Sequence, residues 1–170
     1  MELAATMTAD TRQQFGALLE QHRGIVFKVA NTYCHHLDDR ADLAQEIAAQ
    51  LWRAWPGYDP SRSFTTWMYR VALNVAISQL RSERHRRTHA VPLDEGMHKV
   101  ADGNAVDPET GQHVLALHRF IHAQQPLDRA LLLLYLEDRG YREIADILGI
   151  SESNVATKIS RLKQRIRNEL

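Results

Sequence analysis

The sequence has little of what marks secreted, membrane-inserted or disulfide-stabilised proteins. Its single cysteine, Cys34, has no partner for an internal disulfide. The apolar run Ala130–Leu136 is far too short to span a bilayer. Residues 1–10 lack the basic patch and apolar segment of a signal peptide. We therefore expect a cytoplasmic protein without membrane insertion.

Motifs for metal binding and catalysis are missing as well. Nine histidines are present, but His35 and His36 are adjacent, and His118 and His122 lack the Glu that a metalloprotease places between such a pair. The sequence contains no Gly-rich phosphate loop and no nucleophile elbow. We expect no metal ligand, no cofactor and no catalytic residue, and hence a protein that is not an enzyme.

The charge is present but unevenly distributed. The formal net charge is zero, yet 61–90 hold six Lys/Arg against one Asp/Glu, and 151–170 hold five against two. The segments 1–60 and 91–150 are net acidic. Two basic segments in acidic surroundings indicate two contacts with a polyanion.

Apolar residues recur at helical spacing through most of the chain. With only eight Gly and five Pro among 170 residues, long helices are allowed. Asp38 or Asp39 is the expected cap of the second helix, and Ser63 that of the third. The amino-terminal part is predicted to form three helices, at about 11–33, 39–55 and 64–87.

Periodicity is lost in 90–112, where Gly, Pro and acidic residues predict a flexible linker. Helices are expected to resume near His113, and Pro126 suits the first turn of a helix that is central to a second core. No strand alternation is visible. The predicted fold class is all-α, with two small helical domains, 1–89 and 113–170, joined by the linker.

The clearest local pattern is a helix-turn-helix near the carboxyl end. Tyr141–Leu148 reads as a short helix, Gly149 suits a left-handed turn residue, and Ser151 can cap the next helix. An apolar stripe at 155, 159, 162 and 166 would face inward. This arrangement presents a recognition helix to duplex DNA, although a solvated basic helix is the alternative. The side chains expected on the exposed face are Asn154, Thr157, Lys158, Arg161 and Arg165.

Two further polar surfaces are expected in the amino-terminal domain. The third helix carries a stripe at Arg70, Asn74, Ile77 and Arg81, beside an aromatic and polar loop, which is typical of single-strand binding. Phe64 and Trp67 are interpreted as core anchors there. The outer face of the second helix carries Asp42, Gln45, Glu46, Gln50 and Arg53, and its spacing alone indicates only solvent exposure.

At these residues the chain resembles the sigma-70 family, specifically the small extracytoplasmic-function (ECF) sigma factors of RNA polymerase. The resemblance is carried by three segments in order, DLAQEIAAQLWRAW (42–55), SFTTWMYRVALNVAISQLR (63–81) and YREIADILGISESNVATKISRLKQRIR (141–167). It implies a sigma factor that binds core RNA polymerase and directs promoter recognition and melting. It also implies an anti-sigma factor as a partner.

The resemblance implies a role for each surface. Asp42, Gln45, Glu46, Gln50 and Arg53 would bind core RNA polymerase. Minus-ten promoter DNA would contact Ser61, Arg62, Ser63, Thr65, Thr66, Arg70, Asn74 and Arg81. The exposed face of the helix-turn-helix would read the minus-thirty-five element. Leu73, Ser78 and Ala156 depart from residues common in relatives, so base preferences cannot be transferred.

Two other functions are compatible with the same features. A stand-alone regulator would use the helix-turn-helix as a dimer on a palindrome, and would bind DNA specifically without polymerase. An interaction protein would instead pack both basic helices against acidic partners without DNA. The neutral overall charge predicts weak binding of the isolated chain to naked duplex, because few phosphates are neutralised.

Overall fold

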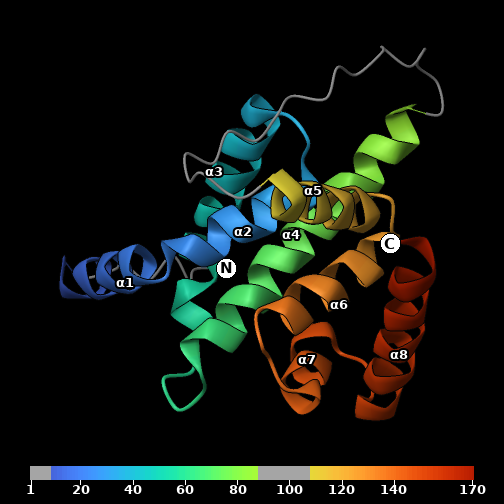
Figure 1. Ribbon diagram of the computed structural model, residues 1–170. Coiled ribbons are helices and arrows are strands. Elements are labelled where there is room, and N and C mark those ends of the chain that lie inside the picture. The colour runs from blue at the N-terminus through green and yellow to red at the C-terminus, as the bar shows by residue number, and fades with distance from the viewer. Residues whose placement is uncertain (1–8, 88–107) are drawn as a thin grey trace.

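The computed structural model describes residues 9–87 and 108–170, without the side chains of 84–87. Within these ranges the chain forms eight α-helices, one short 3₁₀ helix and no strand (Figure 1). The predicted all-α class is confirmed. The elements are α1 (Ala9–Gln21), α2 (Arg23–Tyr33), α3 (Leu37–Ala54), η1 (Trp55–Gly57), α4 (Phe64–Arg87), α5 (Pro108–His122), α6 (Pro126–Leu136), α7 (Tyr141–Leu148) and α8 (Glu152–Glu169).

The single helix expected over 11–33 is two helices, with the break at His22. The backbone of His22 leaves the helical region (φ −112°, ψ 15°), and α2 restarts directly after it. The imidazole of His22 packs against the ring of Phe64, with centroids 5.3 Å apart. Packing against α4 therefore accompanies a change of direction that helical periodicity alone did not predict.

Helices α2, α3 and α4 enclose the core of the amino-terminal half, which we define as α1–α4. Leu43, Ile47 and Leu51 of α3 are fully buried, as their spacing predicts. The helix starts earlier than expected, with His36 at the N-cap position, so Asp38 and Asp39 lie in the first turn instead. Both carboxylates still lie at the positive end of the helix dipole.

Helix α4 does not bury all of its apolar side chains to the same extent. Met68, Tyr69 and Leu73 are almost fully buried, whereas Val71 and Val75 are only half-buried. The carboxy-terminal half (α5–α8) explains why Tyr69 and Leu73 are buried. Its helices α6 and α7 also pack against α4.

Helix α5 begins at Pro108, five residues before the expected start at His113. Proline at the first position of a helix lacks only an N–H that would be unpaired there, and its φ suits the helix. The sequence interpretation counted Pro108 and Gly111 as helix breakers, which is wrong for 108–112. The rest of the predicted linker, 90–107, lies outside the described residues.

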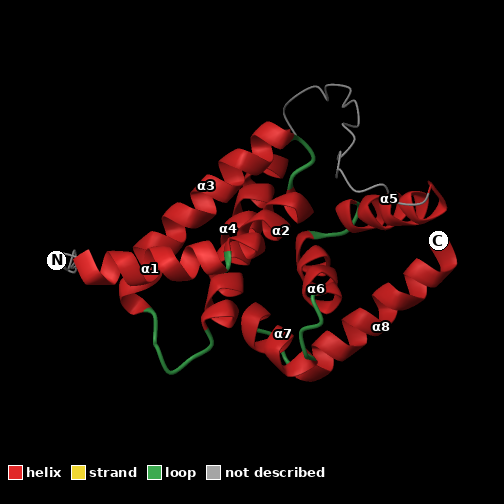
Figure 2. Ribbon diagram, turned by 60° about the vertical axis from the view of Figure 1, so that its left-hand side comes forward, coloured by secondary structure: helices red, strands yellow, loops and turns green. Residues whose placement is uncertain are grey.

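The carboxy-terminal half is built around α6. Residues 130–134 are all buried, and α5, α7 and α8 pack against this helix. The two halves are in direct contact, and their buried residues form one continuous cluster. Helices α3 and α8 lie on opposite sides of the molecule in both views (Figures 1 and 2). Among the described residues, no helix combines the length and hydropathy required to cross a membrane.

Candidate nucleic-acid and polymerase-binding surfaces

The helix-turn-helix of α7 and α8 forms as its turn chemistry predicts. Gly149 adopts the left-handed conformation (φ 68°), which only glycine reaches without steric cost. The hydroxyl of Ser151 accepts a hydrogen bond from the Asn154 backbone N–H at 3.1 Å and so caps α8. Val155 and Ile159 are buried against the rest of the half. The buried stripe orients the opposite face of α8 outward.

The predicted minus-thirty-five set divides into two parts. Asn154, Thr157 and Arg161 are exposed along α8, with Lys158 half-buried beside them. Arg165 is exposed too, but its guanidinium donates to the Gln124 side chain at 2.8 Å and lies 5.4 Å from the centroid of the Phe120 ring. Arg165 therefore ties α8 to α5, in addition to any role on DNA.

The loop before α4 is held in a defined shape by its own side chains. Asp59 accepts hydrogen bonds from the backbone N–H and the hydroxyl of Ser61, at 2.9 and 2.8 Å. These bonds lower the pKa of the Asp59 carboxyl. Tyr58 donates to the carbonyl of Arg62 at 2.8 Å, and Ser63 caps α4 through the Thr66 N–H at 3.4 Å. A loop ordered in this way can present exposed hydroxyls and a guanidinium to a ligand.

Aromatic rings under this loop form a packed cluster. The Trp55 and Tyr58 rings stack at 5.1 Å, and Trp67 lies within 6 Å of Phe64 and Tyr58. Phe15 of α1 also contacts Trp55. Phe64 and Trp67 are both half-buried and pack against the core, as the sequence interpretation expected.

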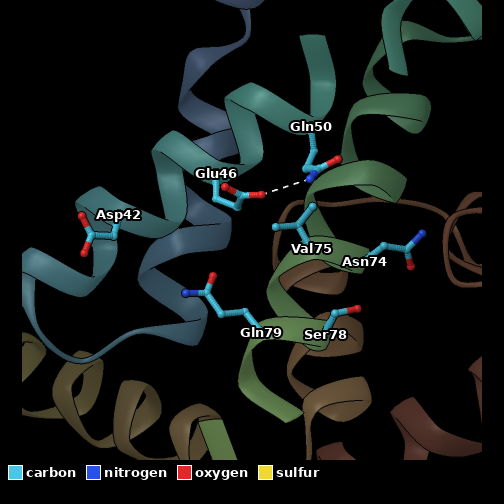
Figure 3. Close-up of a pocket in the computed structure, with 7 residues that line it drawn as sticks. All are labelled: Asp42, Glu46, Gln50, Asn74, Val75, Ser78 and Gln79. Atoms are coloured by element: carbon cyan, nitrogen blue, oxygen red, sulfur yellow. Dashed lines mark hydrogen bonds between the residues drawn. The ribbon is translucent and has the colours of Figure 1, made fainter. Parts of the chain in front are cut away.

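Three residues of the predicted polymerase-binding set and one of the minus-ten set, Asn74, line one groove between α3 and α4 (Figure 3). On the α3 side, Gln50 donates to the carboxylate of Glu46 at 3.0 Å. Gln45 and Arg53 are exposed on the same helix but are not part of the groove. The groove thus joins a mainly acidic wall to a polar wall, and its lining consists of Asp42, Glu46, Gln50, Asn74, Val75, Ser78 and Gln79.

Other members of the predicted minus-ten set lie in different surroundings. Asn74 and Arg81 are exposed on α4. Thr65, Thr66 and Arg70, near the start of the same helix, are half-buried because they contact side chains from the carboxy-terminal half. The structure therefore does not present this set as one open surface.

A second contact between the halves is buried, and the sequence interpretation missed it. The Tyr33 hydroxyl of α2 donates to the carbonyl of Pro126 at 2.6 Å, and the Arg129 guanidinium lies 5.8 Å from the centroid of the Tyr33 ring. Arg129 is only 5% exposed and donates to the carbonyls of His122 and Gln124. The sequence around a buried Arg in an apolar helix does not indicate which groups the Arg will contact.

Next to Arg129, two histidines from different halves lie ring against ring. The centroids of His35 and His122 are 4.1 Å apart. Burial, followed by the neighbouring charge of His35 and Arg129, lowers the pKa of His122 to about 3. The His122 ring is therefore neutral at physiological pH. At the same contact, burial raises the pKa of the Tyr33 phenol.

Comparison with known families matches both halves separately. Residues 18–86 match the model for sigma-70 region 2, and residues 116–166 match the model for sigma-70 region 4. The first match spans α2, α3 and almost all of α4, and the second spans the last part of α5, all of α6 and α7, and most of α8. Hereafter, region 2 and region 4 denote these two segments.

Similar proteins are described as RNA polymerase sigma factors. The chain is 26% identical over 166 residues to "Probable RNA polymerase sigma factor RfaY" of Xanthomonas campestris, covering 95% of this chain and 42% of that protein. It is 28% identical over 158 residues to ECF RNA polymerase sigma factor SigE of Mycolicibacterium smegmatis, covering 90% of this chain and 60% of that protein. The chain thus spans about half the length of these two relatives.

A solved structure shows the same fold. The sigma factor RpoE of Bartonella quintana, determined in complex with the anti-sigma factor NepR, superposes with a TM-score of 0.71 at 16% identity. The alignment covers 95% of this chain and 96% of that one. With both regions present in the same order and a shared fold, the chain belongs to the sigma-70 family.

Proposed function

We propose that the chain is an ECF sigma factor that binds core RNA polymerase and directs promoter recognition and melting. One observation carries the proposal: both sigma-70 regions are present in order, and each exposes a polar helix face. A protein of this kind is not an enzyme itself, because the polymerase performs the chemistry. Its place of action is the cytoplasm.

Each surface takes one role in this proposal. The outer face of α3 binds core polymerase, α4 and its preceding loop bind minus-ten DNA, and α8 reads the minus-thirty-five element. The exposed Asn154 and Arg161 of α8 are of the types that pair with adenine and guanine in the major groove. The exposed amide of Asn74 can hydrogen-bond an unstacked base.

An anti-sigma factor is part of the same proposal. The similar RpoE structure was determined with an anti-sigma factor bound, and this chain shares its fold over nearly its whole length. Exposed apolar side chains on α2 and α5, such as Phe27 and Leu115, offer surface for such a partner.

Reconstitution tests the proposal directly. Core RNA polymerase, the purified chain and a library of promoter fragments are combined, and transcripts are counted with and without the chain. Transcription that depends on the chain supports the proposal. If the chain does not associate with polymerase, the proposal is wrong. Specific nanomolar binding to a palindrome without polymerase would favour a stand-alone dimeric regulator instead.

Replacing Asn74 separates the two functions of region 2. We expect Asn74→Ala to reduce open-complex formation roughly tenfold, because one base contact of this kind contributes a factor of that order. Permanganate footprinting of the melted promoter measures open complex, and co-purification measures association with core. Ser82→Ala, which alters another exposed position of α4, is the matched control and should behave as wild type. Loss of core association in Asn74→Ala would reject the assignment.

A further inference from the structure

Helix α8 is held differently along its length. Val155 and Ile159, in its first half, are buried, and α6 and α7 pack against the helix. Its carboxyl end approaches the end of α5 in both views (Figures 1 and 2). There, the Arg165 guanidinium donates to the side-chain oxygen of Gln124 at 2.8 Å and lies 5.4 Å from the centroid of the Phe120 ring. A side-chain contact therefore fixes the end of α8 that is farther from the turn.

Gln124, between α5 and α6, is a buried polar residue whose amide is bonded at both ends. It is only 4% exposed. Its Nε2 donates to the carbonyl of Phe120 at 2.8 Å, while its Oε1 accepts from Arg165. Its backbone carbonyl accepts from Nε of Arg129 at 3.0 Å. A buried amide is costly unless it is hydrogen-bonded, and bonds at both ends select one orientation. Gln124 thus offers Arg165 an acceptor in a fixed position.

The contacts of Arg165 differ from those that its place on α8 predicts. It follows Asn154 by 11 positions and Arg161 by four, so its backbone lies on the same face of the helix as these two residues. Its guanidinium is nevertheless bonded to Gln124, and its Nε lies 3.7 Å from the carboxylate of Glu169. Arg165 is thus engaged by the protein at the point where the exposed face of α8 meets α5.

We propose that Gln124 and Arg165 are positioning residues, which set the angle at which α8 meets the minus-thirty-five duplex. Arg165 acts on the direction of the helix through Gln124 and does not contact DNA. This inference rests on the proposed function, because it concerns how the same helix reads the promoter. It assigns a role to Gln124 and gives Arg165 a different role from that of Asn154 and Arg161.

The required accuracy explains why the end of α8 needs an anchor. Side chains of a binding site must be held within roughly 0.5 Å of their productive positions. A tilt of about 10° around Val155 moves Arg161, roughly 9 Å farther along the helix axis, by about 1.6 Å, which exceeds that tolerance. The contact between Arg165 and Gln124 lies one turn beyond Arg161 and restricts such a tilt.

Two substitutions remove the anchor and spare the fold. Gln124→Met keeps an unbranched side chain of similar length but has no amide. The carbonyl of Phe120 also accepts from the N–H of Ala123 at 3.2 Å, so it keeps a donor in this variant. Arg165 is exposed, so Arg165→Met leaves the core intact and tests the proposal even if Gln124→Met does not fold. The matched control is Arg167→Met, which removes the same charge from an exposed position two residues farther along.

The first test measures how well the holoenzyme discriminates between two labelled promoter fragments. One fragment carries the minus-thirty-five element that the wild-type holoenzyme enriches from the promoter library, and the other carries a scrambled element. Fluorescence anisotropy measures both affinities. Gln124→Met and Arg165→Met should each lower the ratio of the affinities about fivefold, because a misplaced base contact loses discrimination of that order. An unchanged ratio in these variants, or an equal loss in Arg167→Met, would overturn the proposal.

The same holoenzymes distinguish positioning from a phosphate contact. If Arg165 acts through Gln124, the variant that carries both substitutions should lose no more discrimination than either single variant. The logarithm of affinity should also fall with the logarithm of salt concentration at the same slope in wild type and Arg165→Met. Losses that multiply, or a slope shallower by about one, would show that Arg165 contacts a phosphate independently, and the proposal would be wrong.

A distance measurement on the free chain tests the anchor without DNA. Spin labels at Gln112→Cys on α5 and Gln164→Cys on α8, in a Cys34→Ser background, report how the end of α8 lies relative to α5; both glutamines are exposed. The distance distribution should broaden in Gln124→Met and in Arg165→Met but not in the control. An unchanged distribution in both variants contradicts the proposal. Failure of the proposed function would appear separately, as absence of polymerase-dependent transcription with the wild-type chain.

Discussion

The contact between regions 2 and 4 has two parts of very different character. Between α4 and α7 the polar contacts, around Arg70 and Glu143, are partly exposed to solvent. Between α2 and the α5–α6 corner it is buried, with Tyr33 and Arg129 each about 5% exposed or less. Exposed ion pairs are weak and salt-sensitive, whereas buried polar groups are costly to leave unpaired. The buried part thus holds the halves together, and the exposed part decides which residues are covered.

The largest effect should follow from removing the buried guanidinium. Arg129→Ala leaves the carbonyls of His122 and Gln124 without their donor and removes the contact with Tyr33. We expect a loss of about 3 kcal/mol in the free energy of unfolding. Urea unfolding followed by circular dichroism measures it. Arg165→Ala, which removes a more exposed guanidinium bonded to the same Gln124, should cost clearly less; equal losses would erase the distinction between the two environments.

Acid should lower the stability of the buried part of the contact progressively as the pH falls. The pKa of His122 is about 3 in the folded protein, below the ordinary value of 6.5, so the fold favours the neutral ring. This contribution to stability is complete above pH 6.5 and is lost as the pH falls from 6.5 toward 3. The positive charges that disfavour its protonation belong to His35, His118, Arg40 and Arg129.

The measurement for His122 is the urea midpoint as a function of pH. The midpoint of wild type should fall between pH 6.5 and 4, and the fall should be smaller in His122→Gln, which cannot be protonated there. Parallel curves for the two proteins would show that His122 does not carry the acid sensitivity.

The smallest effect should come from an exposed ion pair at the edge of the contact. Lys28 of α2 bonds Glu137 at 2.6 Å, but the Lys28 side chain is 50% exposed. Lys28→Gln should lower the free energy of unfolding by less than about 1 kcal/mol, and high salt should remove the difference from wild type. A large loss in the free energy of unfolding that does not depend on salt would show that this pair behaves like the buried contacts.

Local chemistry was sufficient to predict the helix-turn-helix from the sequence. The bounds of α7, the left-handed Gly149 and the cap at Ser151 are all as predicted. Each depends on residues within one or two turns, so composition and spacing carry the information. The early starts of α3 and α5 were missed, because His36 is an uncommon residue at the N-cap position and because Pro108 was counted as a helix breaker, although proline suits the first position of a helix.

The contact between the regions could not be predicted, because its partners are far apart in the sequence. Arg70 and Asp146 are separated by 76 positions, and Tyr33 and Pro126 by 93. Helical periodicity records which side of a helix is apolar but not which helix will cover it. The exposed faces of α3 and α8 were identified from the sequence, and their assigned roles stay predictions.

The groove between α3 and α4 has a consequence for how such a chain can change over time. Its walls carry residues assigned to two different partners, with Glu46 on the α3 wall and Asn74 on the α4 wall, where Val75 and Gln79 also lie. A substitution at Val75 or Gln79 changes the α4 wall and the groove that it shares with α3, so selection for a new promoter also acts on the fit to polymerase. We expect positions on the two walls to co-vary among relatives, whereas the exposed face of α8 is free to diversify independently.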